Sequence, residues 1–180
     1  DEQARVLTAR FGRLEIVNLY VPHGDLPGTE KFVHKIQFLR ALRLALEERE
    51  PNSEWLVVVG DMNVARTDRD VWAPKAVEGM VGVLPEEREA FEELLAWGLI
   101  DCYRELHPTG SDFTWWDYRG GAIWKNAGMR IDYVLVTPPI APACKTVRID
   151  LWARRRRKPT PSDHAPVIAE FDLRLVRDSD

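Results

Sequence analysis

The sequence predicts a single globular domain of the mixed α/β class. Between residues 30 and 49, apolar side chains recur every three or four positions with charges between them, which predicts an amphipathic helix. Residues 55–59 form a continuous apolar run rich in β-branched side chains. This run is too short for a helix and is typical of a strand buried on both faces. Helices and strands are therefore mixed along one chain.

Composition agrees with one ordinary globular domain and excludes several classes of protein. The chain has 180 residues, of which 45% are hydrophobic and 30% charged, as in typical globular domains. No apolar run approaches the roughly 20 residues that span a bilayer, so we expect no membrane association. Cys102 and Cys144 have neither metal-site nor disulfide-framework spacing, which favours a cytoplasmic protein. The formal net charge of −4 means that any nucleic-acid contact depends on a local basic patch.

The remaining elements follow from turn residues and β-rich runs. Gly12 separates two β-rich runs, 6–11 and 14–21, which predicts a hairpin. Pro85 opens a second amphipathic helix that ends before Gly98. Beyond this helix the pattern is mainly β. Strands are expected at residues 113–118, 131–137, 146–152 and 167–173.

Polar residues at predicted strand ends are the candidates for chemistry. Asp61 and Asn63 follow the buried strand 55–59, at the sheet edge where ligands bind in α/β proteins. They suit a metal or a general base, although an Asx-type turn is an equal alternative. Tyr20 closes another predicted strand. Its phenol either reaches a phosphate or caps the core.

Asp132 interrupts an otherwise apolar predicted strand, where a carboxylate needs a partner to be tolerated. An imidazole would serve, and Asp163 and His164 lie side by side after a proline-rich turn. Taken alone, the position of His164 favours a surface loop residue over a functional one. A carboxylate bonded to a histidine fixes the tautomer of the imidazole and raises its basicity. Because the chain has no activated-serine motif, we expect water to be the group that is activated.

Two segments concentrate aromatic, cationic and amide side chains, as nucleic-acid-binding surfaces do. They are residues 114–119, which include Trp115 and Arg119, and residues 125–130, which include Asn126 and Arg130. A run of five cations at 154–158 either is a solvated loop or binds phosphates.

These motifs, in this order, resemble the exonuclease III family of class II abasic-site endonucleases, within the endonuclease/exonuclease/phosphatase superfamily. The resemblance extends over nearly the whole chain. The blocks that carry it are residues 18–22, 60–63, 113–119, 125–133 and 162–167. The resemblance implies two mixed β-sheets packed as a sandwich and flanked by helices. It also implies hydrolysis of a phosphodiester with a divalent metal, usually Mg²⁺, with Mn²⁺ as a substitute.

The resemblance further implies a role for each catalytic candidate. Asp61 would activate the attacking water, and Asn63 would orient the site and the phosphate. These two residues, with Asp163, would hold the metal. Asp132 would hold His164, which would bond or protonate a phosphoryl oxygen. Tyr20 would contact the scissile phosphate.

By the same resemblance, Trp115 would pack at the pocket for a flipped-out abasic sugar, and Arg119, Asn126 and Arg130 would lie near the DNA. The implied partner is double-stranded DNA with abasic sites or 3′ ends, bound by a monomer. The implied activities are abasic-site incision and 3′→5′ exonuclease action. Two alternatives stay open, a noncatalytic nucleic-acid-binding fragment and a phosphodiesterase acting on RNA or a small phosphate ester.

One family feature has no counterpart in this sequence. The family begins with a strand that carries an asparagine and continues to a loop with a metal-binding glutamate. Neither motif occurs here, and the first methionine is Met62. We therefore expect residues 1–180 to be one domain that is incomplete at its N-terminus. A sheet without those strands would have exposed edges and apolar faces, which predicts marginal stability.

Overall fold

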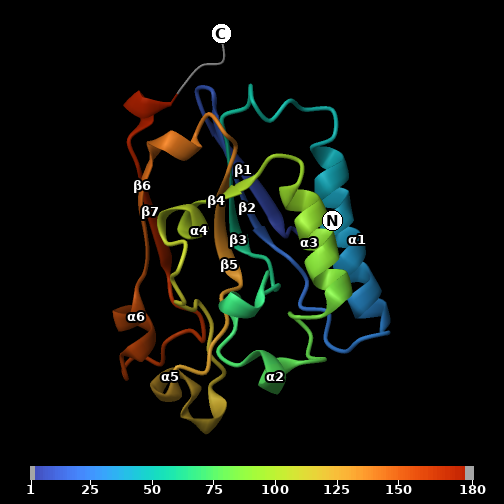
Figure 1. Cartoon of the computed structure of the whole chain (residues 1–180), viewed down its shortest axis with the longest axis vertical. Helices are drawn as coiled ribbons and strands as arrows, with labels where there is room; N and C mark the ends of the chain where they lie inside the picture. Colours follow the sequence, from blue (N-terminus) through green and yellow to red (C-terminus); the bar gives the residue numbers. More distant parts are fainter. Residues whose placement is uncertain (1–2, 177–180) are drawn as a thin grey trace.

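A computed structural model describes residues 3–176 and shows two β-sheets with helices around them (Figure 1). The larger sheet has five strands in the order β1-β2-β3-β5-β4. The hairpin strands β1 and β2 are antiparallel, β2 is parallel to β3, and β5 is antiparallel to both β3 and β4. The strands span Val6–Phe11 (β1), Leu14–Tyr20 (β2), Leu56–Asp61 (β3), Ile100–Asp101 (β4) and Asp132–Val136 (β5).

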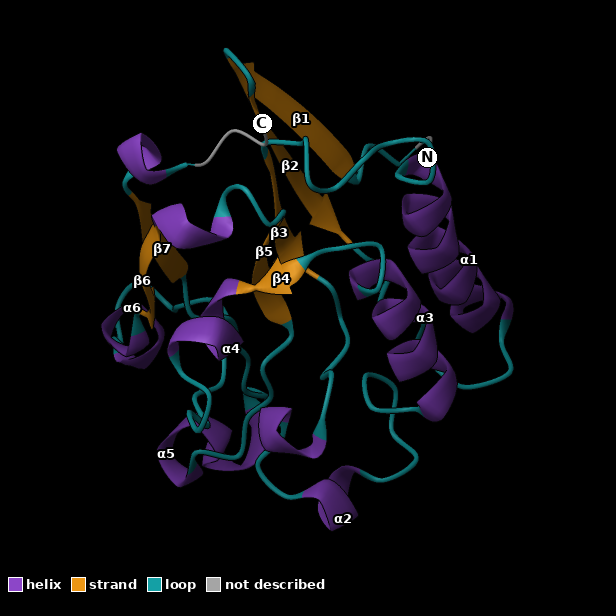
Figure 2. Cartoon of the chain, turned by 45° about the horizontal axis from the view of Figure 1, so that its top comes forward, coloured by secondary structure: helices purple, strands orange, loops and turns teal. Residues whose placement is uncertain are grey.

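The smaller sheet and the two long helices lie on opposite sides of the larger sheet. Strands β6 (Cys144–Ile149) and β7 (Val167–Phe171) form an antiparallel pair. Helices α1 (Glu30–Ala45) and α3 (Pro85–Leu95) pack side by side away from that pair (Figures 1 and 2). The shorter helices are α2 (Pro74–Val77), α4 (Cys102–Leu106), α5 (Ala122–Lys125) and α6 (Leu151–Arg155), and 3₁₀ turns lie at Asp68–Asp70, Arg119–Gly121, Ala141–Ala143 and Leu173–Leu175.

Side chains alternate between the two faces of a strand, so those of β3 pack into two different hydrophobic cores. Leu56 and Val58 pack with α1 and α3 in the larger core, whereas Val57 and Val59 pack on the side of the smaller sheet. Asp61 continues this second series. The sequence pattern therefore directs the last carboxylate of β3 toward the space between the two sheets.

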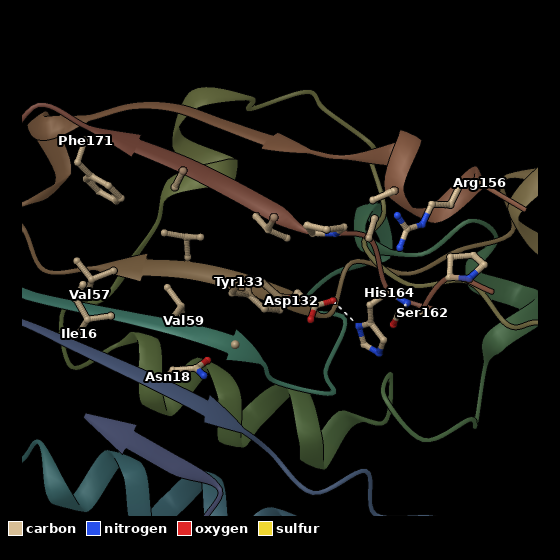
Figure 3. A pocket seen from close by; sticks show the side chains of 18 residues that line it. Ile16, Asn18, Val57, Val59, Asp132, Tyr133, Arg156, Ser162, His164 and Phe171 are labelled. Atoms are coloured by element: carbon tan, nitrogen blue, oxygen red, sulfur yellow. Dashed lines mark hydrogen bonds and ion pairs between the residues drawn. The ribbon is translucent and has the colours of Figure 1, made fainter. Parts of the chain in front are cut away.

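A cleft of about 730 Å³ separates the inner faces of the two sheets. Figure 3 shows side chains of the two sheets facing each other across it, with Ile16, Val57 and Val59 on one side and Phe171 on the other. At one end of the cleft lie Asp132 and His164. The fold thus positions a polar site at the end of a largely apolar cleft.

The α/β class with two sheets is confirmed, and within the described residues the second sheet is an antiparallel pair and not a mixed sheet. The predicted strand 113–118 is wrong. Its backbone N–H groups bond to different segments, with Trp115 donating to Met129 O and Trp116 to Asp163 O, so no ladder forms. The predicted helix 30–49 ends at Ala45, and the last residues of the predicted strand 146–152 lie in α6. None of the described helices is long and apolar enough to cross a membrane.

Candidate active site

Two carboxylates and one imidazole meet where β3 ends and β5 begins. Asp61 and Asp132 are opposite each other in the antiparallel register of these strands. The third side chain, His164, comes from the loop before β7. Ligand atoms of all three residues lie within 4.8 Å of one another. The sheet topology therefore assembles side chains that are about 70 and 30 residues apart in sequence.

Asp132 orients His164, as the interruption of its apolar strand predicts. Nδ1 of His164 lies 2.9 Å from Asp132 Oδ2 (Figure 3), so the carboxylate keeps a proton on Nδ1. Nε2 then faces Asp61, 3.9 Å from its Oδ2. The Thr114 hydroxyl accepts the backbone N–H of Asp132 at 3.1 Å and fixes the start of β5. The imidazole is thus held in one orientation and is no free surface group.

Asp61 and Asn63 form an Asx turn and still face the site. The Asn63 backbone N–H donates to Asp61 Oδ1 at 2.8 Å, which is the hydrogen bond that defines this turn. Asn63 Nδ2 donates to Asp61 Oδ2 at 3.1 Å and to Val21 O at 2.8 Å. Asn63 itself has a left-handed backbone, with φ of +52°. The turn and the site are therefore compatible, since one turn orients both side chains.

The two carboxylates carry negative charge that no cation fully compensates. Burial, together with the nearby charge of Asp132, raises the pKa of Asp61 from its ordinary value to about 7. Burial disfavours the charged form of His164, but the hydrogen bond and the charge of Asp132 raise the pKa of His164 above its usual value. The site therefore attracts protons or another cation.

This electrostatic strain predicts how the stability of the metal-free protein depends on pH. The unfolded carboxyl releases its proton near pH 4, whereas folded Asp61 keeps it up to about pH 7. The native state binds more protons in this window, so stability falls as the pH rises. Protonated His164 contributes in the same direction. In EDTA, we expect Asp61→Asn to remove about 3 kcal/mol of the stability that is lost between pH 5 and pH 7.5, because folded Asp61 keeps its proton over about two of these pH units and each unit is worth about 1.4 kcal/mol. Urea unfolding at pH 5 and pH 7.5 measures the free energy of unfolding of both proteins. An equal change between the two pH values in the unaltered protein and in Asp61→Asn would contradict this prediction.

Tyr20 ends β2 opposite Asp61 in the parallel register. Its side chain is 47% exposed, which excludes the interpretation that it caps the core. Two residues earlier on the same face, Asn18 lines the cleft beside Val59 and Asp132. Asn18 was not among the functional residues predicted from the sequence. The signal was present, because Asn18 and Tyr20 are polar at alternate positions of one strand.

Asp163 does not join the cluster of Asp61, Asp132 and His164. Its Oδ2 instead accepts a hydrogen bond of 3.0 Å from Nε1 of Trp115. Trp115 also forms isolated β-bridges with Met129 and His164. The structure therefore places Trp115 and Asp163 beside the catalytic candidates. The assignment of Asp61, Asn63 and Asp163 as metal ligands stays a prediction.

The prediction that Arg130 contacts DNA is wrong. Its side chain is 1% exposed, and its Nε donates to Asp70 Oδ1 at 2.7 Å. A second ion pair of 2.8 Å joins its Nη2 to Asp101 Oδ2. The guanidinium also lies over the ring of Tyr133, 4.5 Å from its centroid. Arg130 is a buried structural cation under the loop that leads to Asp132.

Two other predicted DNA-binding residues lie on the surface around α5. Arg119 is exposed and forms an ion pair of 2.7 Å with Asp117. Asn126 ends α5 in a left-handed conformation, and its Oδ1 accepts a hydrogen bond from Trp116 Nε1 at 3.3 Å.

The run of cations at 154–158 is divided between the interior and the surface. Arg154 is buried, and it donates from Nε to Asp163 O (3.1 Å) and from Nη2 to Trp116 O (3.0 Å). The remaining four side chains are exposed. Arg154 therefore holds the loop that carries His164, and only residues 155–158 are available to a ligand.

The donor set fits a hard divalent cation. Asp61 and Asp132 offer carboxylate oxygens, the ligands that Mg²⁺ and Mn²⁺ prefer. Burial of Asp61 and the nearby charge of Asp132 raise the pKa of Asp61, so a cation bound beside it would favour its charged form. Because Asn63 Nδ2 is engaged by Asp61 and Val21, its amide oxygen remains to accept a bond. A cation here would neutralise charge that the protein itself leaves unbalanced.

Comparisons with known proteins agree with this arrangement. The chain matches the Endonuclease/Exonuclease/phosphatase family over residues 1–164. Exodeoxyribonuclease III of Haemophilus influenzae is 38% identical over 186 residues, which cover 95% of this chain and 68% of that protein. A DNA-(apurinic or apyrimidinic site) endonuclease of Dictyostelium discoideum is 30% identical over 96% of this chain and 47% of its own length.

Solved structures show the same fold. The Neisseria 3′ phosphatase NExo bound to a product DNA hairpin superposes with a TM-score of 0.89 at 39% identity, covering 96% of this chain and 66% of that one. An AP endonuclease from Archaeoglobus fulgidus gives a TM-score of 0.88 at 36% identity, covering 93% and 65%. The chain thus spans about two thirds of the length of these two structures. On the combined evidence of sequence, fold and site, the chain belongs to the Endonuclease/Exonuclease/phosphatase family.

Proposed function

We propose that this chain is a divalent-metal-dependent DNA repair nuclease that hydrolyses phosphodiester bonds at abasic sites and at 3′ ends. The observation that carries the proposal is the cluster of Asp61, Asp132 and His164 at the sheet edge. Relatives named exodeoxyribonuclease III and AP endonuclease support the substrate class. We further propose that the protein acts as a monomer in the cytoplasm.

In the proposed reaction, each side chain acts from the position described above. Asp61, whose Oδ2 lies 3.9 Å from His164 Nε2, takes a proton from the attacking water as a general base. His164 presents Nε2 while Asp132 holds Nδ1, so the imidazole binds or protonates the phosphoryl oxygen on which charge develops. At the exposed end of β2, Tyr20 contacts the scissile phosphate.

A divalent cation, Mg²⁺ or Mn²⁺ in its place, would be held by Asp61 and Asn63, with Asp163 adjacent. When bound, it supplies charge stabilisation for the pentavalent phosphoryl group. The chain's own contribution is to hold the carboxylates and the imidazole within 4.8 Å before the substrate arrives. Such preorganisation lowers the barrier because little rearrangement remains to be made.

The proposed DNA surface adjoins the site on α5 and α6. Arg119 and the exposed cations of residues 155–158 supply positive charge, although the whole chain has a net charge of −4. Exposed Trp124 and Trp152 lie on these two helices, and aromatic rings can stack on bases. Trp115, beside Asp163 and His164, would border the position of an abasic sugar.

Neutralising exposed cations of α6 and its following loop is expected to weaken DNA binding and its dependence on salt. The variant Arg155→Gln/Arg157→Gln removes two exposed charges. Each lost phosphate contact reduces the slope of log K against log salt by about 0.9. Fluorescence anisotropy of a labelled duplex at four salt concentrations measures this slope. The matched control, Arg40→Gln/Arg43→Gln, removes two charges from α1, on the other side of the molecule (Figure 1). Equal slopes for the two variants would show that residues 155–158 are merely solvated.

A substrate panel tests the proposed activity against its alternatives. It contains a duplex with one abasic site, a duplex with a recessed 3′ end, an RNA strand and a small phosphate diester, all at one salt concentration. We expect cleavage of the two DNA substrates. Cleavage of RNA or of the small ester alone would indicate a different phosphodiesterase. Binding without cleavage would indicate a noncatalytic nucleic-acid-binding protein.

A further inference from the structure

One buried ion pair joins the two helices behind the site. Lys35 of α1 and Glu87 of α3 are both 0% exposed, and the Lys35 ammonium pairs with Glu87 Oε1. The same ammonium donates to Asn63 O at 2.7 Å and to His23 O at 3.1 Å. An ammonium has three protons, so each of them has a partner. Two of these partners are backbone carbonyls of loops at the site.

Stability alone does not explain why a lysine occupies this position. The face of α1 around it is apolar, with Phe32, Phe38 and Leu39 buried beside it. Replacing a buried ion pair by packed apolar side chains is often neutral or stabilising, because desolvation offsets the attraction of the charges. What an apolar side chain cannot do is hold the two carbonyls.

Those carbonyls belong to the loops that follow β2 and β3. Residue 23 lies three positions after Tyr20, and residue 63 lies two positions after Asp61. The loops also contact each other directly, since Val21 N–H donates to Asp61 O at 2.8 Å. Lys35 therefore ties together the two strand ends that carry Tyr20 and Asp61.

Lys35 adds a restraint to the left-handed backbone of Asn63, a conformation that asparagine adopts more readily than most other non-glycine residues. The φ of Asn63 is +52°, and its backbone N–H donates to Asp61 Oδ1. The bond from Lys35 holds the carbonyl on the opposite side of the same residue. Glu87 completes the arrangement, because its Oε2 accepts the N–H groups of Gly82 (2.7 Å) and Leu84 (3.0 Å).

We propose that Lys35 is a positioning residue, which fixes the Asp61–Asn63 turn against the end of β2 through the carbonyls of His23 and Asn63. Its effect on catalysis rests on the proposed function, whereas its effect on the turn does not. Because it acts through other residues, its loss displaces Asp61 without removing any group that touches DNA.

The test uses the double variant Lys35→Met/Glu87→Met, which removes both buried charges and leaves neither of them unpaired. The matched control is Arg40→Met/Glu93→Met. This second ion pair also joins α1 and α3, at 3.6 Å, but on the surface and away from both loops. We expect the Lys35 double variant to lose about 10- to 100-fold in kcat on an abasic-site duplex, as for a displacement on the order of 1 Å. KM for the duplex is expected to change little, and the control to match the unaltered protein in both constants.

Amide hydrogen exchange gives a readout that does not depend on activity. In the Lys35 double variant, we expect the N–H groups of residues 21 and 63 to lose protection by at least about tenfold, while the core of β3 stays protected. Unchanged protection at these two residues in a folded double variant would overturn the inference. An unaltered kcat in that folded variant would overturn its catalytic part. If the unaltered protein cleaves no phosphodiester, the proposed function fails, and the exchange data alone decide whether Lys35 positions the turn.

Discussion

Replacing Asp61 with asparagine is expected to lower kcat on an abasic-site duplex by about 10²- to 10⁴-fold, the usual contribution of a general base. The substitution keeps the size of the side chain and an oxygen for the Asn63 N–H, so the turn should persist. It removes the carboxylate oxygen that would accept the proton of the attacking water. Affinity for DNA should stay within about threefold, because a group used mainly in the transition state contributes little to ground-state binding.

Single-turnover cleavage and fluorescence anisotropy, measured on the same duplex, separate these two quantities. The Glu48→Gln variant, at an exposed position in the turn after α1, serves as the matched control, since it makes the same change of functional group away from the site. Equal losses of binding and of turnover in Asp61→Asn would contradict the assignment of Asp61 as the base.

Replacing Arg130 with methionine is expected to destabilise the protein by about 3–5 kcal/mol, as when one partner of a buried ion pair is removed. Asp70 and Asp101 are buried, and Arg130 contacts both of them. Arg104 remains paired with Asp70, but Asp101 would lose its cation. Because small domains have only about 5–15 kcal/mol of stability, this loss is a large fraction of the total.

Urea unfolding at pH 7 measures the change, with Arg119→Met as the control. Arg119 forms only a surface ion pair with Asp117, and such pairs contribute about 0–1 kcal/mol. If Arg130→Met instead kept its stability and lost affinity for DNA, the side chain would be a DNA contact after all and the buried network would be irrelevant.

The site was predictable from sequence where a residue conflicted with its local pattern. Asp132 interrupts an apolar strand and therefore needs a partner, and the structure supplies His164 at 2.9 Å. Asp61 follows a strand whose apolar run fixes the direction of its side chain. Lys35 gave the same kind of signal, because it lies three residues after Phe32 and four before Leu39, on the apolar face of its helix. Lys35 was nevertheless not predicted as a functional residue, because this helix carries many other charged side chains.

Other features depend on partners that are distant in sequence and leave no local pattern. Arg130 and Arg154 are cations in segments that look like a basic, aromatic surface, yet both are buried. The burial of Arg130 depends on Asp70 and Asp101, which lie 60 and 29 positions away. Residues 113–118 have the composition of a strand, but their N–H groups bond to two separate segments and form a loop. Contacts between residues distant in sequence determine the burial of these two arginines and the loop at residues 113–118, and local sequence propensity contains no information on such contacts.

Metal-dependent cleavage of a duplex with a single abasic site tests the central proposal most directly. The measurement compares the protein in Mg²⁺ with the same protein in EDTA, and it records DNA binding in parallel by anisotropy. The cluster of Asp61, Asp132 and His164 predicts incision in Mg²⁺, no incision in EDTA, and similar binding in both. Equal incision in Mg²⁺ and EDTA, or binding without incision in Mg²⁺, would contradict the proposal that this cluster is a metal-dependent nuclease site.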